Sequence, residues 1–174
     1  GRDVVDQMAR NKDKIALIWC NDCNTERVLT FQEIADSSNQ VANWLIEQDI
    51  SQGDRVIVML PRIPEWQICL TACLKLGAVP IPCITMLTEK DIAYRMDHSG
   101  AAAVITTAAE TSKFQTRLPT LKAALAIGGA VAGWSDYELI SDQDRRFECC
   151  DLGLDEPAIM YYTSGSTGDP KGVC

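Results

Sequence analysis

Two kinds of apolar pattern alternate along the chain. Short uninterrupted apolar runs are typical of buried strands, whereas apolar residues spaced three and four apart are typical of helices. The runs predict strands at 14–19, 27–29, 55–60, 78–81, 103–106, 123–127 and 157–162. The helical spacings predict helices at 31–48, 64–76, 88–100, 112–118 and, briefly, 136–140. Because strands and helices mostly alternate, the pattern predicts an α/β fold with a largely parallel sheet covered by helices on both faces.

Turn residues and prolines refine this picture. A short polar turn at 21–24 joins the first two strands, which predicts a small N-terminal hairpin. Pro61 and Pro82 are expected to end the strands that precede them, because proline has no N–H to donate to a strand ladder.

Capping residues mark the ends of the predicted helices. Glu33 follows Thr30 by three positions, which is the capping-box pattern, and Pro64 suits a first helical turn because the N–H it lacks has no partner there. Gly77 and Gly100 follow the last apolar residues of two helices, where a left-handed glycine commonly ends a helix.

Composition places the chain among globular domains. It has 174 residues, of which 47% are hydrophobic and 23% charged, and we expect residues 1–174 to form one unit. The net charge is −8 and no basic cluster extends beyond Arg145 and Arg146, which argues against a nucleic-acid partner. The uncharged stretch 123–134 is too short to span a bilayer, and the first residues do not resemble a secretory signal.

The eight cysteines raise the question of metal or disulfide chemistry. Cys20 and Cys23 have CxxC spacing, but a second pair at zinc-ribbon distance is missing and the sole histidine, His98, is far away in sequence. Cys69 and Cys73 lie four apart in an apolar helical run, which indicates core packing. We therefore expect free thiols, no metal site, and a cytoplasmic or other reducing location.

The segment 161–172 has the composition of a phosphate-binding loop. Its glycines allow backbone N–H groups to approach an anion, its hydroxyl groups add donors, and Lys171 adds a cation. The apolar run 157–162 predicts a buried strand that delivers this loop at the carboxyl end of the sheet, where ligands of such folds bind. The predicted phosphate contacts are Thr163, Ser164, Gly165, Ser166, Thr167, Gly168 and Lys171.

Two other interpretations of this segment fit less well. The Walker A pattern fails, because the position of its second glycine is occupied by Pro170 and Lys171 is followed by Gly172 instead of Ser or Thr. A plain Gly/Ser linker is disfavoured by the strand predicted before the loop and by the fixed Pro-Lys-Gly after it.

The order of residues in 163–172 resembles the signature loop of the adenylate-forming superfamily, which includes acyl-CoA synthetases, luciferases and adenylation domains of peptide synthetases. Segments 59–66 and 88–95 are similar to the medium-chain and aromatic acyl-CoA synthetase branch. The resemblance implies a Rossmann-like or flavodoxin-like part of the N-terminal AMP-binding domain. Since enzymes of this kind are much longer, it also implies that the chain is a piece of one, inactive by itself, with catalytic residues expected beyond Cys174.

The resemblance further implies the chemistry of the whole enzyme. Such an enzyme activates a medium-chain or aromatic carboxylic acid with ATP and Mg²⁺, releases pyrophosphate, and transfers the acyl group to coenzyme A. A peptide-synthetase adenylation domain is an alternative that shares the loop. A non-catalytic nucleotide-binding or interaction module is an alternative from a different class.

Four residues outside these predictions receive ordinary structural interpretations. His98 falls in the last turn of a predicted helix, where a role at the surface is favoured over general-base catalysis. Trp66 and Tyr94 occupy helical positions, where core packing is favoured over an acyl pocket. Asp169 lies within the loop and is assigned no role.

Overall fold

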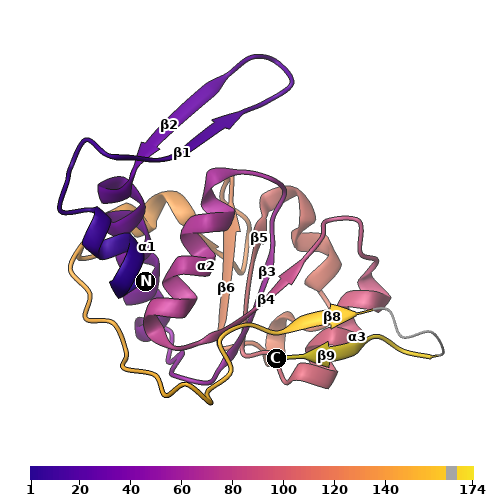
Figure 1. The fold of residues 1–174 in the computed structure, drawn as a ribbon. Coiled ribbons are helices and arrows are strands. Elements are labelled where there is room, and N and C mark those ends of the chain that lie inside the picture. The colour runs from indigo at the N-terminus through magenta and orange to yellow at the C-terminus, as the bar shows by residue number, and fades with distance from the viewer. Residues whose placement is uncertain (164–167) are drawn as a thin grey trace.

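A parallel sheet forms the centre of the protein (Figure 1). The computed structural model describes residues 1–163 and 168–174, and within them this sheet has five strands in the order β4-β3-β5-β6-β7, each parallel to its neighbours. The strands are β3 (Arg55–Met59), β4 (Val79–Cys83), β5 (Ala103–Thr107), β6 (Ala123–Ile127) and β7 (Ser135–Asp136). This is the flavodoxin-like strand order, so the predicted α/β class is confirmed.

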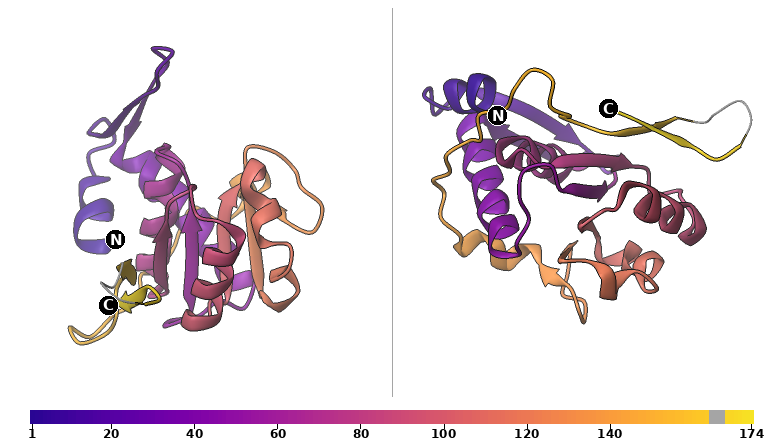
Figure 2. Two further views of the ribbon diagram at one scale, coloured as in Figure 1. Left: turned by 90° about the vertical axis from the view of Figure 1, so that its right-hand side faces the viewer. Right: turned by 90° about the horizontal axis from the view of Figure 1, so that it is seen from below.

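Helices cover both faces of the sheet (Figure 2). The α-helices are α1 (Phe31–Glu47), α2 (Pro64–Leu76) and α3 (Glu89–Ser99). Alternate residues of β3 point in opposite directions: Val56 and Val58 join the core under α1 and α2, whereas Ile57 and Met59 join the core under α3. Both faces of β3 are therefore buried, which explains why its sequence is an unbroken apolar run.

The predicted caps of α1, α2 and α3 are confirmed. The Thr30 hydroxyl accepts a hydrogen bond from the Glu33 N–H at 3.2 Å, and the Glu33 carboxylate accepts one from the Thr30 N–H at 2.7 Å. The bond from the Thr30 N–H, together with a bond that the Thr30 hydroxyl donates to the same carboxylate at 2.9 Å, holds the pKa of Glu33 below its usual range. Gly77 and Gly100 end α2 and α3 in the left-handed conformation, with φ of 79° and 61°.

Three predictions about local structure differ in detail from the observed elements. The strand expected to end at Pro82 continues to Cys83, because β4 is an edge strand and its prolines need no partner on the outer side. The helix predicted at 112–118 is replaced by two 3₁₀ segments, Ala108–Phe114 and Leu118–Thr120. The short helix near 136–140 is a 3₁₀ turn at Tyr137–Asp142, preceded by the two residues of β7.

The predicted N-terminal hairpin is present. Strands β1 (Ile15–Cys20) and β2 (Glu26–Thr30) pair antiparallel and extend away from the main body (Figure 1). The indole Nε1 of Trp19 donates to the carbonyl of Arg62 at 2.5 Å, which ties the hairpin to the loop between β3 and α2.

The strand predicted at 157–162 is only partly correct. The strand β8 covers Tyr161–Thr163 and pairs antiparallel with β9 (Lys171–Val173), so it forms a separate two-stranded sheet. Residues 157–158 are exposed and 159–160 are half-buried, so the segment is not a buried strand of the main sheet. The apolar composition of this run reflects packing of a few side chains at the sheet edge instead of full burial.

A buried lysine joins the N-terminal turn, Arg2–Asp6, to α1 and α2. The Lys75 side chain is 0% exposed, and its Nζ donates to Asp6 Oδ1 at 2.6 Å, to Asn39 Oδ1 at 2.6 Å and to the Ala35 carbonyl at 3.4 Å. The thiol of Cys149 donates to the other oxygen of the Asp6 carboxylate at 3.4 Å. One ion pair thus links four segments that are distant in sequence.

The described part of the chain contains all eight cysteines, and each has a free thiol. Cys69 and Cys73 are buried, as predicted, whereas Cys20 and Cys23 are exposed. Burial raises the pKa of Cys73 to about 12, so this thiol stays protonated at neutral pH. No helix among the described residues has the length and apolar character needed to cross a membrane.

Candidate functional site

The predicted phosphate-binding segment, 161–172, begins in β8 and ends in β9. Its first predicted contact, Thr163, is paired with its last, Lys171, across the two-stranded ladder. Gly168 has a φ of 107°, and a Cβ built there meets no atom within 4 Å. The other predicted contacts, Ser164, Gly165, Ser166 and Thr167, lie outside the described residues. The structure therefore brings the two ends of the segment together at the end of a hairpin.

The location of this hairpin differs from the prediction in one respect. The loop does not leave the carboxyl end of a strand of the parallel sheet, because β8 belongs to its own sheet. The hairpin is instead attached to the open edge of β4, where the Met160 N–H donates to the Pro80 carbonyl at 3.0 Å. The Pro80 carbonyl faces the open side of the edge strand β4, at a position where the missing N–H of proline takes no bond from the ladder.

The second half of helix α3 contacts the hairpin β8–β9. The Tyr94 hydroxyl donates to the Pro170 carbonyl at 2.9 Å, next to Lys171. The Tyr162 hydroxyl lies 2.8 Å from Nδ1 of His98 and donates to the Arg95 carbonyl at 3.3 Å. His98 is in the last turn of α3 and exposed, as predicted, but its contact with Tyr162 was not foreseen. The signal available in the sequence was the spacing of four between Tyr94 and His98, which places both rings on one helix face.

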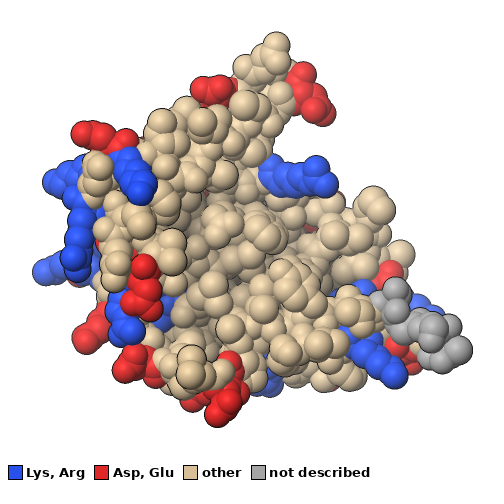
Figure 3. Space-filling model, in the orientation of Figure 1, with Lys and Arg blue, Asp and Glu red and all other residues tan. Residues whose placement is uncertain are grey.

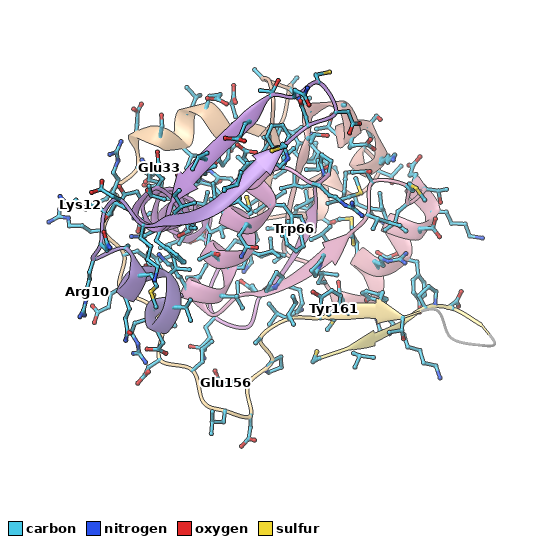
Figure 4. All side chains as sticks on the ribbon, turned by 45° about the horizontal axis from the view of Figure 1, so that its top comes forward. Arg10, Lys12, Glu33, Trp66, Glu156 and Tyr161 are labelled. Carbon is cyan, nitrogen blue, oxygen red and sulfur yellow. The ribbon has the colours of Figure 1, made fainter. Side chains whose placement is uncertain are left out.

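An apolar pocket of about 710 Å³ lies beside the hairpin. It is formed by β1, the loop from β3 to α2, the start of α2, the end of β4 with the loop that follows it, one residue of α3, and β8. Trp66 and Tyr161 both line it, and both are labelled in Figure 4. Trp66, for which core packing was favoured, is half-buried and lines this pocket while also packing against the core under α1 and α2. The volume is within the range of small-molecule sites.

The face between the two hairpins carries few charges (Figure 3). Two cationic side chains, Arg62 and Arg95, contribute to the pocket lining. Arg95 donates to the Asp91 carbonyl at 2.9 Å, and among the described residues no carboxylate lies within ion-pair distance of it. Burial raises the pKa of the pocket thiol Cys83 to about 11 although Arg95 opposes the shift. The charges lining the pocket are therefore positive at neutral pH.

The described residues contain no cluster of three or more His, Cys, Asp or Glu side chains that could hold a metal ion. Burial raises the pKa of Tyr162, so its hydroxyl remains a hydrogen-bond donor at neutral pH. The described part of the hairpin therefore offers hydroxyl groups and the Lys171 ammonium for binding.

Comparisons with known proteins agree on one family. A family model described as AMP-binding enzyme matches residues 4–174. "Acyl-coenzyme A synthetase ACSM4, mitochondrial" of Mus musculus is 36% identical over 162 residues, which make up 90% of this chain and 28% of that protein. The chain thus spans less than a third of the length of this relative.

Solved structures give the same result. An acyl-CoA synthetase of Brucella canis superposes with a TM-score of 0.84 at 29% identity, over 94% of this chain and 30% of that one. The anthranilate CoA ligase AuaEII, solved in complex with anthranoyl-AMP, superposes with a TM-score of 0.86 at 26% identity, over 97% of this chain and 33% of that one.

Proposed function

Because the chain belongs to the AMP-binding enzyme family, we propose that the protein containing it is an ATP-dependent acid–thiol ligase. The carboxylate of the acid attacks the α-phosphate of ATP and displaces pyrophosphate, which gives an acyl-adenylate. The thiol of coenzyme A then attacks the acyl carbon and displaces AMP, which gives an acyl-CoA.

The observation that carries this proposal is the hairpin that places Thr163 opposite Lys171 at the two ends of a glycine- and hydroxyl-rich segment. Charge builds on the leaving pyrophosphate during the first step, so hydroxyl donors and a cation held at that point stabilise the transition state. We assign this role to Thr163 and Lys171, together with residues 164–167 and the turn at Gly168.

Mg²⁺ is proposed to enter as part of the substrate, bound to the phosphates of ATP. Mg²⁺ usually keeps several waters and is bound by substrate phosphates with only one or two carboxylates, which fits an ion carried by the nucleotide. The bound ion would neutralise part of the phosphate charge.

The acid is proposed to be medium-chain or aromatic. The support is the similarity of segments 59–66 and 88–95 to that branch and the likeness to an anthranilate CoA ligase. Pyrophosphate release by the whole protein, measured with a panel of acids of increasing chain length and with benzoate derivatives, tests this. Preference for acetate or for long-chain acids would contradict it.

Exchange of labelled pyrophosphate into ATP by the whole protein tests the role of Lys171. Loss of one such stabilising donor costs about 2.7 to 4 kcal/mol, so Lys171→Ala is expected to lower the exchange rate at least tenfold. Lys12→Ala is the control, because Lys12 is exposed and lies far from Tyr161 (Figure 4). An unchanged exchange rate in Lys171→Ala would remove the assignment.

Two further measurements separate this function from the alternatives. Thioester formation with free coenzyme A distinguishes a ligase from an adenylation domain that loads a carrier domain. Absence of any acid-dependent exchange would indicate a non-catalytic nucleotide-binding module. We also propose that the 174 residues alone do not form acyl-adenylate, since they correspond to only 28% of the mouse relative.

The location of the protein is proposed to be cytoplasmic or another reducing compartment. The support is that all eight cysteines are free and that several are exposed. Fractionation of cells with an antibody against the chain tests this, and recovery from an oxidising compartment would contradict it.

A further inference from the structure

The hairpin β8–β9 has little internal means of holding its position. Each strand has three residues, and in each only the middle residue is half-buried while its neighbours are exposed. A two-stranded hairpin alone is marginally stable in water. The position of the two strands must therefore come from contacts with the rest of the protein.

One such contact lies directly beside Lys171. The Tyr94 hydroxyl donates to the carbonyl of Pro170 at 2.9 Å, and this carbonyl belongs to the peptide unit that leads into Lys171. Pro170 is half-buried, and its ring restricts the backbone on the other side of the same residue. The hydrogen bond thus fixes the backbone from which the lysine side chain extends.

A second contact lies on the opposite strand. The Tyr162 hydroxyl lies 3.3 Å from the Arg95 carbonyl, to which it donates, and its oxygen also lies 2.8 Å from Nδ1 of His98. The Arg95 guanidinium also lies 5.3 Å from the centre of the Tyr162 ring, which adds a cation–π contact.

The rings of the two contacts form a single cluster. Tyr94 and His98 stack at a centroid distance of 5.6 Å, and Tyr162 meets both edge-on at 6.4 and 5.6 Å. Gly172 provides the space for this packing, because a Cβ there would lie 3.2 Å from Met160 Sδ and 3.6 Å from the Tyr162 ring. The strand partner of Tyr162 therefore needs to be small.

Helix α3, which carries Tyr94 and His98, is fixed at both ends and along its buried face. The capping box of Thr88 and Asp91 fixes the start of α3, and the left-handed Gly100 ends it. Ile92 and Met96 anchor the helix in the core under the sheet. Displacement of Tyr94 would require movement of a capped and packed helix.

We infer that Tyr94 is a positioning residue that sets the place of Lys171 for the ATP phosphates, with the contact between Tyr162 and His98 as a second anchor. This inference rests on the proposed function. In this inference, contacts from α3 fix the positions of both ends of the phosphate-binding segment.

Tyr94→Phe removes the hydroxyl and keeps the ring, so it tests the hydrogen bond alone. In the whole protein, loss of one neutral hydrogen bond is expected to lower kcat/KM for ATP roughly twofold to tenfold, with the KM for the acid unchanged. Tyr137→Phe is the matched control, since Tyr137 is a half-buried tyrosine in a distant 3₁₀ turn. A loss of rate that only matches a loss of folded protein, measured by circular dichroism on the same samples, would overturn the inference.

Amide hydrogen exchange in the same proteins gives a readout that does not depend on activity. Peptides covering 161–174 are expected to exchange several-fold faster in Tyr94→Phe and in His98→Ala, while peptides from β3 and β5 stay unchanged. Unchanged exchange of 161–174 in Tyr94→Phe overturns the inference, and the same result in His98→Ala overturns the second anchor. If the unsubstituted protein shows no pyrophosphate exchange with any acid, the proposed function fails. The amide exchange then still decides whether Tyr94 fixes the position of the hairpin β8–β9.

Discussion

Replacing Asp6 with asparagine should destabilise the protein more than replacing its partner Lys75 with methionine. The two ends of this ion pair differ in access to water: the Lys75 side chain is 0% exposed, whereas that of Asp6 is 30% exposed. A carboxylate left without its partner can be hydrated in place, but an ammonium left in the interior cannot. The cost of a broken buried pair therefore depends on which partner remains.

The magnitudes follow from the contacts that survive each change. Removing one partner of a buried pair costs about 3 to 5 kcal/mol. For Asp6→Asn we expect the lower end, about 3 kcal/mol, because Lys75 keeps the acceptors of Asn39 and Ala35. For Lys75→Met the main loss is the bond to Asn39, about 1 kcal/mol, since methionine fills most of the space of the lysine stem.

Urea unfolding followed by circular dichroism measures both values. In thermal unfolding, Asp6→Asn should lower the midpoint by roughly 6 to 12 °C and Lys75→Met by roughly 2 to 4 °C. Asp3→Asn is the control, because Asp3 is in the same turn but exposed and paired only with the exposed Arg2; we expect no change in midpoint. The reasoning is refuted if Lys75→Met costs as much as Asp6→Asn, or if Asp6→Asn behaves like the control.

Three other outcomes test the local structure. Thr30→Ala should lower the free energy of unfolding by about 1 kcal/mol through loss of the α1 cap, and a neutral effect in urea unfolding would argue against that cap. Gly77→Ala should lower the free energy of unfolding more than Gly53→Ala. Both glycines have φ near 80°, and an alanine in this conformation alone costs about 1 to 2 kcal/mol. Only at Gly77 does an added Cβ also meet side chains, those of Leu152 at 3.0 Å and Gln52 at 3.2 Å. Equal urea midpoints for these two variants would contradict the contacts. Iodoacetamide at pH 8 should alkylate the exposed Cys20 readily and Cys73 only after unfolding. Mass spectrometry follows the modification of each cysteine. Early modification of Cys73 would show that its side chain is not buried as described.

Elements whose signals are local could be predicted from the sequence. The capping box at Thr30 and the glycines at 77 and 100 were found because each interaction spans a few residues. The unbroken apolar run of β3 predicted burial on both faces for the same reason. The error at 157–162 arose because an apolar run alone does not distinguish a central strand from a segment at the sheet edge.

The candidate site was only partly accessible from sequence. The composition of 161–172 indicated phosphate binding, because glycine, hydroxyl groups and lysine have that chemistry in any context. The attachment of this segment to α3 was missed, since Tyr94 and Pro170 are 76 positions apart and His98 and Tyr162 are 64 apart. The side chains of α3 looked like ordinary helix residues until their partners were known.

By itself, then, the sequence determined the α/β class, most helix ends and the side-chain composition from which phosphate binding by 161–172 is proposed, because periodicity, caps and side-chain chemistry act over short distances. Only the tertiary structure decided the strand order β4-β3-β5-β6-β7, the pairing of the buried Lys75 with Asp6, and the packing of β8–β9 against α3. These features depend on contacts between distant segments, whose favourable pairings form only when the chain has packed around its core.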